Sequence, residues 1–194
     1  MKLKLFIVTF WLLLFNSIAF PQFYFGKNKV QYTHFDWQVL NTPHFNIFFY
    51  SEEKELAEIA GKLAEESFEF LENKFNHYIF TPIPLIIYSS PNYFEQTNVI
   101  PNLLPENVAG FTEFFKGRMV IPFDGSYSAF AEVLRHELVH VFTIAKLNTV
   151  MKAHRRLTYT EPPLWFTEGI AELWSRNWDS HSDMIIKDMV ISGN

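Results

Sequence analysis

The chain has 194 residues, 48% of them hydrophobic, so it is long enough to bury the core of one domain. Its formal net charge is −5 and it carries no basic stripe, which argues against a nucleic-acid binder. It has no cysteine, so disulfides, thiolate ligands and cysteine nucleophiles are excluded, and any metal site must use histidine and carboxylate side chains.

Residues 1–19 have the pattern of a signal peptide. Two lysines precede an apolar run at residues 5–15, and the small residues Ser17 and Ala19 stand three and one positions before a cleavage point. A membrane anchor is the alternative, but this run is too short to cross about 30 Å of hydrocarbon comfortably. The pattern predicts export to the periplasm, the cell envelope or the medium. Residues 20–194 would then form the mature domain, with no membrane span after signal removal.

The first part of the mature chain predicts strands followed by a long helix. Two β-rich runs, residues 35–40 and 45–50, flank an Asn-Thr-Pro turn and predict a hairpin. A helix is expected from residue 52 to about residue 76, with Ser51 as its N-cap and its glutamates on a solvated face. His44 is expected at a strand edge on the surface. The apolar stripe of the helix comprises Leu56, Ile59, Leu63, Phe68, Leu71 and Phe75.

The middle of the chain predicts more strands. Residues 83–88 form an apolar run between prolines, which indicates a strand, and residues 91–106 have the composition of a loop. Residues 109–123 predict a second hairpin that turns at Lys116-Gly117. With the helix that follows, the order is β–α–β–β–α. This order describes an α+β domain, in which a small mixed sheet packs on helices.

The helix predicted at residues 128–147 contains the sequence His-Glu-Leu-Val-His. Apolar residues recur along it near a 3.6-residue period, and Ser126 and Ser128 offer N-caps. Residues four apart share a helix face, so His136 and His140 can place two imidazoles on one ion. The intervening Glu137 can reach a water on that ion. This is the His-Glu-x-x-His arrangement of zinc peptidases.

A zinc site also needs a third protein ligand. Residues 163–173 predict a helix that begins after a pair of prolines and carries Glu168, with Glu172 four residues later on the same face. Glu168 would complete a His₂Glu site with an open fourth position. His154 competes for this role, but it falls in the polar connection at residues 148–161, without a rigid helical frame, so Glu168 is preferred.

These two motifs together resemble the gluzincins, the thermolysin- and aminopeptidase-like metallopeptidases. The similarity is greatest to the peptidase MA-like domains of bacterial envelope proteins, and it covers roughly residues 35–178. It implies a zincin-like fold in which His136, His140 and Glu168 bind Zn2+ and Glu137 is the catalytic carboxylate. The metzincin pattern does not fit, because it requires Gly and His at the third and sixth positions after the second His.

The resemblance also implies roles for neighbouring residues. In gluzincins the last strand before the zinc helix pairs with the extended substrate, so residues 110–115 are the candidate substrate strand. Aminopeptidases of this clan hold the free amine of the substrate with a Glu near the place of Glu113, although a solvent-facing Glu113 is favoured here. Glu172 matches an acidic residue that orients a zinc-bound His, or it is an exposed helix carboxylate. Tyr159 is a candidate for the oxyanion-stabilising group that gluzincins take from a later subdomain.

The sequence thus predicts an exported zinc-dependent peptidase. It would cleave a peptide or protein substrate with a water activated by zinc and Glu137. The alternative is a non-catalytic envelope binding module that retains a peptidase-like zinc site. Some peptidase MA-like domains continue into a TolB-like β-propeller, so the chain is expected to be the N-terminal part of a longer protein. The intact Glu137 favours the enzyme, since a purely structural zinc site does not need that carboxylate.

Overall fold

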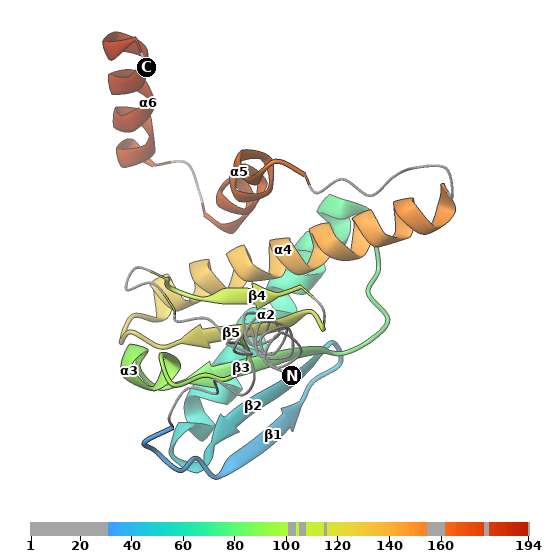
Figure 1. Ribbon diagram of the computed structural model, residues 1–194, viewed down its shortest axis with the longest axis vertical. Coiled ribbons are helices and arrows are strands. Elements are labelled where there is room, and N and C mark those ends of the chain that lie inside the picture. Colours follow the sequence, from blue (N-terminus) through green and yellow to red (C-terminus); the bar gives the residue numbers. More distant parts are fainter. Residues whose placement is uncertain are drawn as a thin grey trace, which may run out of the picture.

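The computed structural model describes residues 31–100, 104, 108–114, 116–154, 162–176 and 179–193. These residues form a sheet and helices that Figure 1 labels α2 to α6. The predicted signal peptide lies outside the described residues, as does Tyr159.

The sheet is mixed and has the strand order β1-β2-β3-β5-β4. Its strands are β1 (Trp37–Asn41), β2 (Phe45–Tyr50), β3 (Ile83–Tyr88), β4 (Phe111–Glu113) and β5 (Arg118–Pro122). β2, β3 and β5 run parallel in the centre, and β1 and β4 are antiparallel edge strands. Both predicted hairpins are confirmed, β1 with β2 and β4 with β5, and so is the α+β class with a mixed sheet.

Three helices, at residues 54–75, 127–153 and 164–175, lie where the sequence predicts them but differ from the prediction at several ends, whereas the helix at residues 180–192 was not predicted. The helices are α2 (Lys54–Phe75), α3 (Pro91–Phe94), α4 (Tyr127–Ala153), α5 (Leu164–Ser175) and α6 (Ser180–Ser192). α4 runs six residues beyond its predicted end at residue 147, so the expected connection at residues 148–161 begins as helix. α3 is a short helix within the segment predicted to be a loop.

Of the two predicted helix N-caps, one is confirmed and one is wrong. Ser126 caps α4, because its hydroxyl accepts a hydrogen bond from the backbone N–H of Ala129 at 3.3 Å. Ser51 is not the N-cap of α2. It begins a 3-10 turn, Ser51–Glu53, and α2 follows that turn without a side-chain cap.

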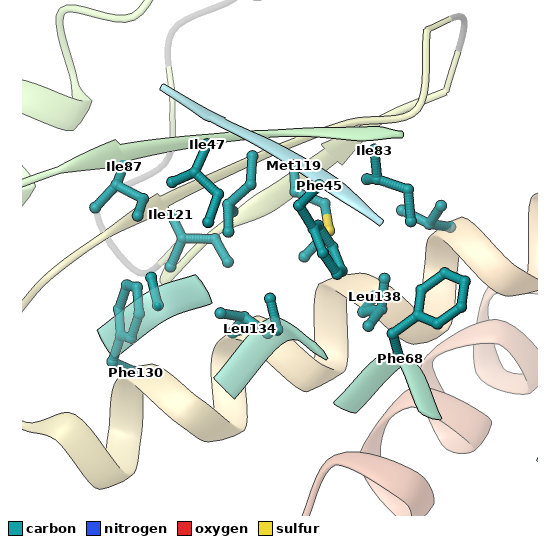
Figure 2. Close-up of a cluster of buried hydrophobic side chains, with 14 of the residues drawn as sticks. Phe45, Ile47, Phe68, Ile83, Ile87, Met119, Ile121, Phe130, Leu134 and Leu138 are labelled. Atoms are coloured by element: carbon teal, nitrogen blue, oxygen red, sulfur yellow. The ribbon is translucent and has the colours of Figure 1, made fainter. Parts of the chain in front are cut away.

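The main core lies between one face of the sheet and the helices α2 and α4. In Figure 2, Ile47 and Ile121 of the sheet point toward Leu134 and Leu138 of α4. Phe68 of α2 lies beside Leu138 at one end of this apolar layer. These five side chains are almost completely buried. Because side chains alternate along a strand, this apolar layer fixes which sheet residues face α4.

The apolar stripe predicted for α2 is only partly correct. Its middle is buried through small residues, namely Ala57, Ala60, Gly61 and Ala64, whereas Ile59 and Leu63 are only partly buried. A Cβ atom on Gly61 would stand 3.3 Å from the Cδ1 atom of Ile47. The small residues therefore let α2 lie close to the sheet, which a stripe read from large side chains does not predict.

The opposite face of the sheet carries a second, smaller core. It contains Phe35, Tyr50, Tyr88, Phe94 and Val120. The central strands β3 and β5 are consequently buried on both faces, which is typical of parallel strands.

The last two helices lie outside these layers. α5 packs against α4 through the buried Ala171, and Trp174 reaches Phe75 of α2 with ring centroids 4.8 Å apart. α6 extends away from the sheet in Figure 1, with exposed apolar side chains such as Val190 and Ile191. Among the described residues, no helix combines the length and the hydropathy that a membrane span requires.

A polar cluster ties the first hairpin to α2. Glu65 accepts hydrogen bonds from the Thr42 hydroxyl at 2.6 Å, from the His44 backbone N–H at 2.9 Å and from His44 Nδ1 at 2.6 Å. Neither the surface position predicted for His44 nor the solvated face predicted for Glu65 is correct, because both side chains are about three-quarters buried. Burial raises the pKa of Glu65, but the hydrogen bonds from Thr42 and His44 outweigh it and hold the pKa below its ordinary 4.5.

Replacing Glu65 with Gln should lower the free energy of unfolding by about 1–3 kcal/mol at neutral pH, because three donors lose a charged acceptor. The pKa of this carboxyl is lower in the folded than in the unfolded chain. Its contribution is therefore present above the unfolded pKa and is lost as the pH falls through the folded pKa. Urea denaturation should show a gap between wild type and Glu65→Gln at about pH 7 that narrows by about pH 3. The exposed neighbour Glu66→Gln is the control, and a gap that persists in acid would contradict the assignment.

Candidate metal centre

The buried face of α4 sets the direction of the two histidines. Leu134, Leu138 and Phe142 of this helix are fully buried in the core against the sheet. His136 and His140 lie on another face of the same helix, four residues apart, and line a cavity on the side away from this core. The core packing thereby points both imidazoles at the same space.

α5 brings the third group to this space. The helix begins after Pro163, and its buried residue Ala171 sets its rotation on α4. Glu168 lies one turn before Ala171 and projects over the pair of histidines. The half-exposed Glu168 side chain therefore depends on the docking of α5 for its place.

The three side chains converge with the spacing of a metal site. The Nε2 atoms of His136 and His140 are 3.2 Å apart, and the Oε2 atom of Glu168 is 3.3 Å from the first and 3.6 Å from the second. Ligand bonds of about 2.0–2.2 Å at tetrahedral angles separate ligand atoms by roughly 3.3–3.6 Å. The ligand atoms and the distances between them therefore fit a zinc ion. Among the described residues, this is the only group of three His, Asp or Glu side chains close enough together to hold a metal ion.

The local environment favours a neutral His140. Burial lowers the pKa of its imidazole, the Glu168 carboxylate raises it, and the neighbouring His136 lowers it again, with a net lowering. A histidine must be deprotonated on one nitrogen to bind a metal, so this environment suits a ligand.

Glu137 is the buried acid of the site. Its side chain lines the cavity yet is almost completely enclosed, and its Oε2 atom accepts a hydrogen bond from the Thr112 hydroxyl at 2.8 Å. Burial raises the pKa of Glu137 to about 7, with a contribution from the Glu168 charge, although the hydrogen bond from Thr112 opposes the rise. A carboxyl with this pKa can both accept and release a proton near neutral pH.

Glu172 lies behind His136. Its Oε1 atom is 3.9 Å from the Nδ1 atom of His136, which is beyond hydrogen-bond length, and its Oε2 atom pairs with Arg176 at 2.6 Å. Its side chain remains half exposed. Glu172 therefore faces the Nδ1 atom of His136 and pairs with Arg176 on its other oxygen, so it has features both of a partner of His136 and of an exposed helix carboxylate.

The cavity beside the three ligands measures about 1120 Å³. The edge strand β4 with its lead-in at residues 108–110 forms one wall, α4 runs along the cavity, and α5 contributes the other wall. Phe114 lines it and is largely exposed. The strand predicted to meet a substrate is thus an edge strand next to the histidines.

Two other candidates do not join the site. His154 lies fourteen residues beyond His140, about 21 Å along the helix axis, and its Nδ1 atom contacts the carbonyl of Val150. Glu113 accepts a hydrogen bond from Arg118 Nε at 3.0 Å, is about 10% exposed and is not among the residues that line the cavity. The prediction that Glu113 faces solvent is therefore wrong. Its side chain does not point into the cavity either, where it could bind the free amine of a substrate.

Three further residues of the site were not predicted from the sequence. Thr112 donates a hydrogen bond to Glu137, the missing side chain of Gly110 leaves room beside Glu137, and Arg176 pairs with Glu172. The alternation within the predicted hairpin could have placed residues 110 and 112 on one strand face, but no local signal shows which helix residue that face meets.

The chain should bind one zinc ion. Replacing His136, His140 or Glu168 with Ala should weaken binding by more than the roughly 10–100-fold that outer partners of metal ligands contribute. Glu172→Gln should fall within that range, and Glu132→Gln, on the cavity wall one turn before His136, is the matched control. Competition titration with a zinc-sensitive dye measures these affinities. Unchanged affinity in Glu168→Ala would exclude this residue as a ligand.

No family model matches the chain, and neither a curated protein nor a solved structure matches it. The resemblance to gluzincins therefore stays a prediction that depends on two sequence motifs. The geometric argument for a metal centre depends on the convergence of two imidazoles and one carboxylate.

Proposed function

We propose that the protein is an exported zinc-dependent peptidase with a zincin-like fold. His136, His140 and Glu168 hold the zinc ion, and Glu137 is the general base. The observation that carries this proposal is the separation of 3.2–3.6 Å among three ligand atoms that line an open cavity. A bound zinc ion supplies Lewis-acid polarisation of a scissile carbonyl and lowers the pKa of a water.

The chain itself supplies the proton transfers. Glu137 accepts the proton of the attacking water and then delivers it to the leaving amine. Its burial supports this role, because a carboxyl with a pKa of about 7 is well matched to both transfers at neutral pH. Glu172 faces the Nδ1 atom of His136 and favours the tautomer whose Nε2 atom is free to bind metal.

The shape of the cavity supports a peptide or protein substrate. An edge strand has unpaired main-chain donors and acceptors, so β4 can bind an extended peptide as a further strand. Such binding would lay the peptide backbone across the wall that also carries Thr112, next to Glu137.

The alternative is a non-catalytic envelope binding module, attached to a C-terminal β-propeller, that keeps the zinc site for structure. Glu137 argues against it. Enclosing a carboxyl in this way costs free energy, and a structural zinc site with three other ligands gains nothing from it.

Glu137→Gln should retain stoichiometric zinc and lose about 10²–10⁴-fold in the rate of peptide cleavage, because it removes the base and keeps the ligands. The measurement is cleavage of a broad peptide library together with metal analysis, with Glu132→Gln as the control. Removal of zinc by a chelator should abolish cleavage, and added zinc should restore it. A wild-type protein that binds zinc and cleaves no peptide would support the binding module instead.

A further inference from the structure

Thr112 connects the edge strand to the acid of the site. It is the middle residue of β4 and is almost fully buried. Its hydroxyl lies 2.8 Å from the Oε2 atom of Glu137 and 3.0 Å from the backbone carbonyl oxygen of the same residue. Both contacts of one side chain thus converge on a single residue of α4.

The Thr112 hydroxyl restricts the carboxylate of Glu137. A buried carboxylate requires a hydrogen-bond donor, and among the described residues Thr112 is the one that donates to it. The hydroxyl has one proton, shared between the carboxylate and the carbonyl, so it links the head of the side chain to its own backbone. The Oε1 atom is the oxygen left for a molecule in the cavity.

Gly110 leaves room for the methylene groups of the same side chain. A Cβ atom at this position would stand 2.9 Å from the Cγ1 atom of Val133 and 3.4 Å from the Cγ atom of Glu137. The backbone before β4 therefore lies directly against Glu137. Gly110 and Thr112 are two residues apart, so the missing side chain of the first leaves room for the methylene groups of Glu137 and the hydroxyl of the second holds its carboxylate.

The position of Thr112 is itself anchored. Thr112 pairs with Met119 of β5, which is fully buried in the main core. Because threonine is branched at Cβ, its χ1 rotation is restricted, and its hydroxyl keeps one direction better than that of serine. The hydroxyl is thereby tied to the sheet through the β4–β5 ladder.

We propose that Thr112 is a positioning residue that aims the free carboxylate oxygen of Glu137 at the reacting water. The inference rests on the peptidase function proposed above and extends it to the edge strand. The strand that can bind the substrate backbone then also orients the base, which couples substrate contact and proton transfer in one element.

The test compares two substitutions of similar size. Thr112→Val removes the hydroxyl and keeps the shape, and Thr112→Ser keeps the hydroxyl. In Thr112→Val, kcat should fall about 10–100-fold while KM and zinc content stay within about twofold, since a misaimed base lowers the rate without removing a ligand. Thr112→Ser should recover kcat to within about fivefold of wild type. An unchanged kcat in Thr112→Val, or an equal loss in Thr112→Ser, would overturn the proposal.

A binding measurement separates this proposal from the proposed function. Acetohydroxamate ligates zinc and donates a hydrogen bond to an adjacent carboxylate. Its affinity for the zinc-loaded protein, measured by calorimetry, therefore depends on the orientation of the Glu137 carboxylate and requires no catalysis. Its affinity should fall in Thr112→Val and in Glu137→Gln, and stay near wild type in Thr112→Ser. If the wild type cleaves no peptide but this pattern holds, the peptidase function fails and the positioning role stands. Equal affinity in wild type and Thr112→Val overturns the role, and a wild type without zinc overturns both.

Discussion

The packing of α4 on the sheet is the constraint on which the rest of the site depends. One face of this helix is buried by Leu134, Leu138 and Phe142, and this burial leaves no freedom of rotation about the helix axis. A turn of α4 by one residue would move its apolar face by about 100° and carry His136 and His140 away from the cavity. The direction of the imidazoles is thus a consequence of the hydrophobic burial of the apolar face of α4.

This arrangement places an ionisable residue where the packing would favour an apolar one. Glu137 lies next to the buried Leu138 and is itself enclosed, which is costly for a carboxylate. The surroundings reduce the cost without removing it: Thr112 donates a hydrogen bond, and the pKa nevertheless remains raised. Departures from good core chemistry of this kind tend to occur at functional sites, where they are offset elsewhere in the fold.

The sequence predicted what is encoded by short-range periodicity. The hairpins, α4 with its motif, and α5 with Glu168 all depend on residues within a few positions of each other. Contacts between distant segments were not predictable in this way. Glu65 meets His44, and Thr112 meets Glu137, only because the sheet and helices are assembled in three dimensions, and no local pattern distinguishes these residues from exposed ones.

The errors at the element ends have a similar origin. Ser51 has the residue type of an N-cap, but the chain leaves β2 through a 3-10 turn, so α2 begins at Lys54, two residues later than predicted. The predicted end of α4 at residue 147 was too early because residues 148 and 149 are polar and a basic stretch at residues 152–156 follows, although an exposed helix end tolerates such residues. For the five strands and for α2, α4 and α5, local propensity predicted the type of the element, whereas its limits depend on the tertiary contacts.

The electrostatics of the site depend on how its two acids are held. Glu137 is fixed from the sheet side by Thr112, and Glu168 approaches from the exposed side on α5. Their charges oppose each other, since Glu168 contributes to the raised pKa of Glu137. A divalent cation between the imidazoles and Glu168 would reverse this relation, because its charge attracts both carboxylates and outweighs their repulsion. The fold therefore holds the two acids close enough for the charge of one to raise the pKa of the other.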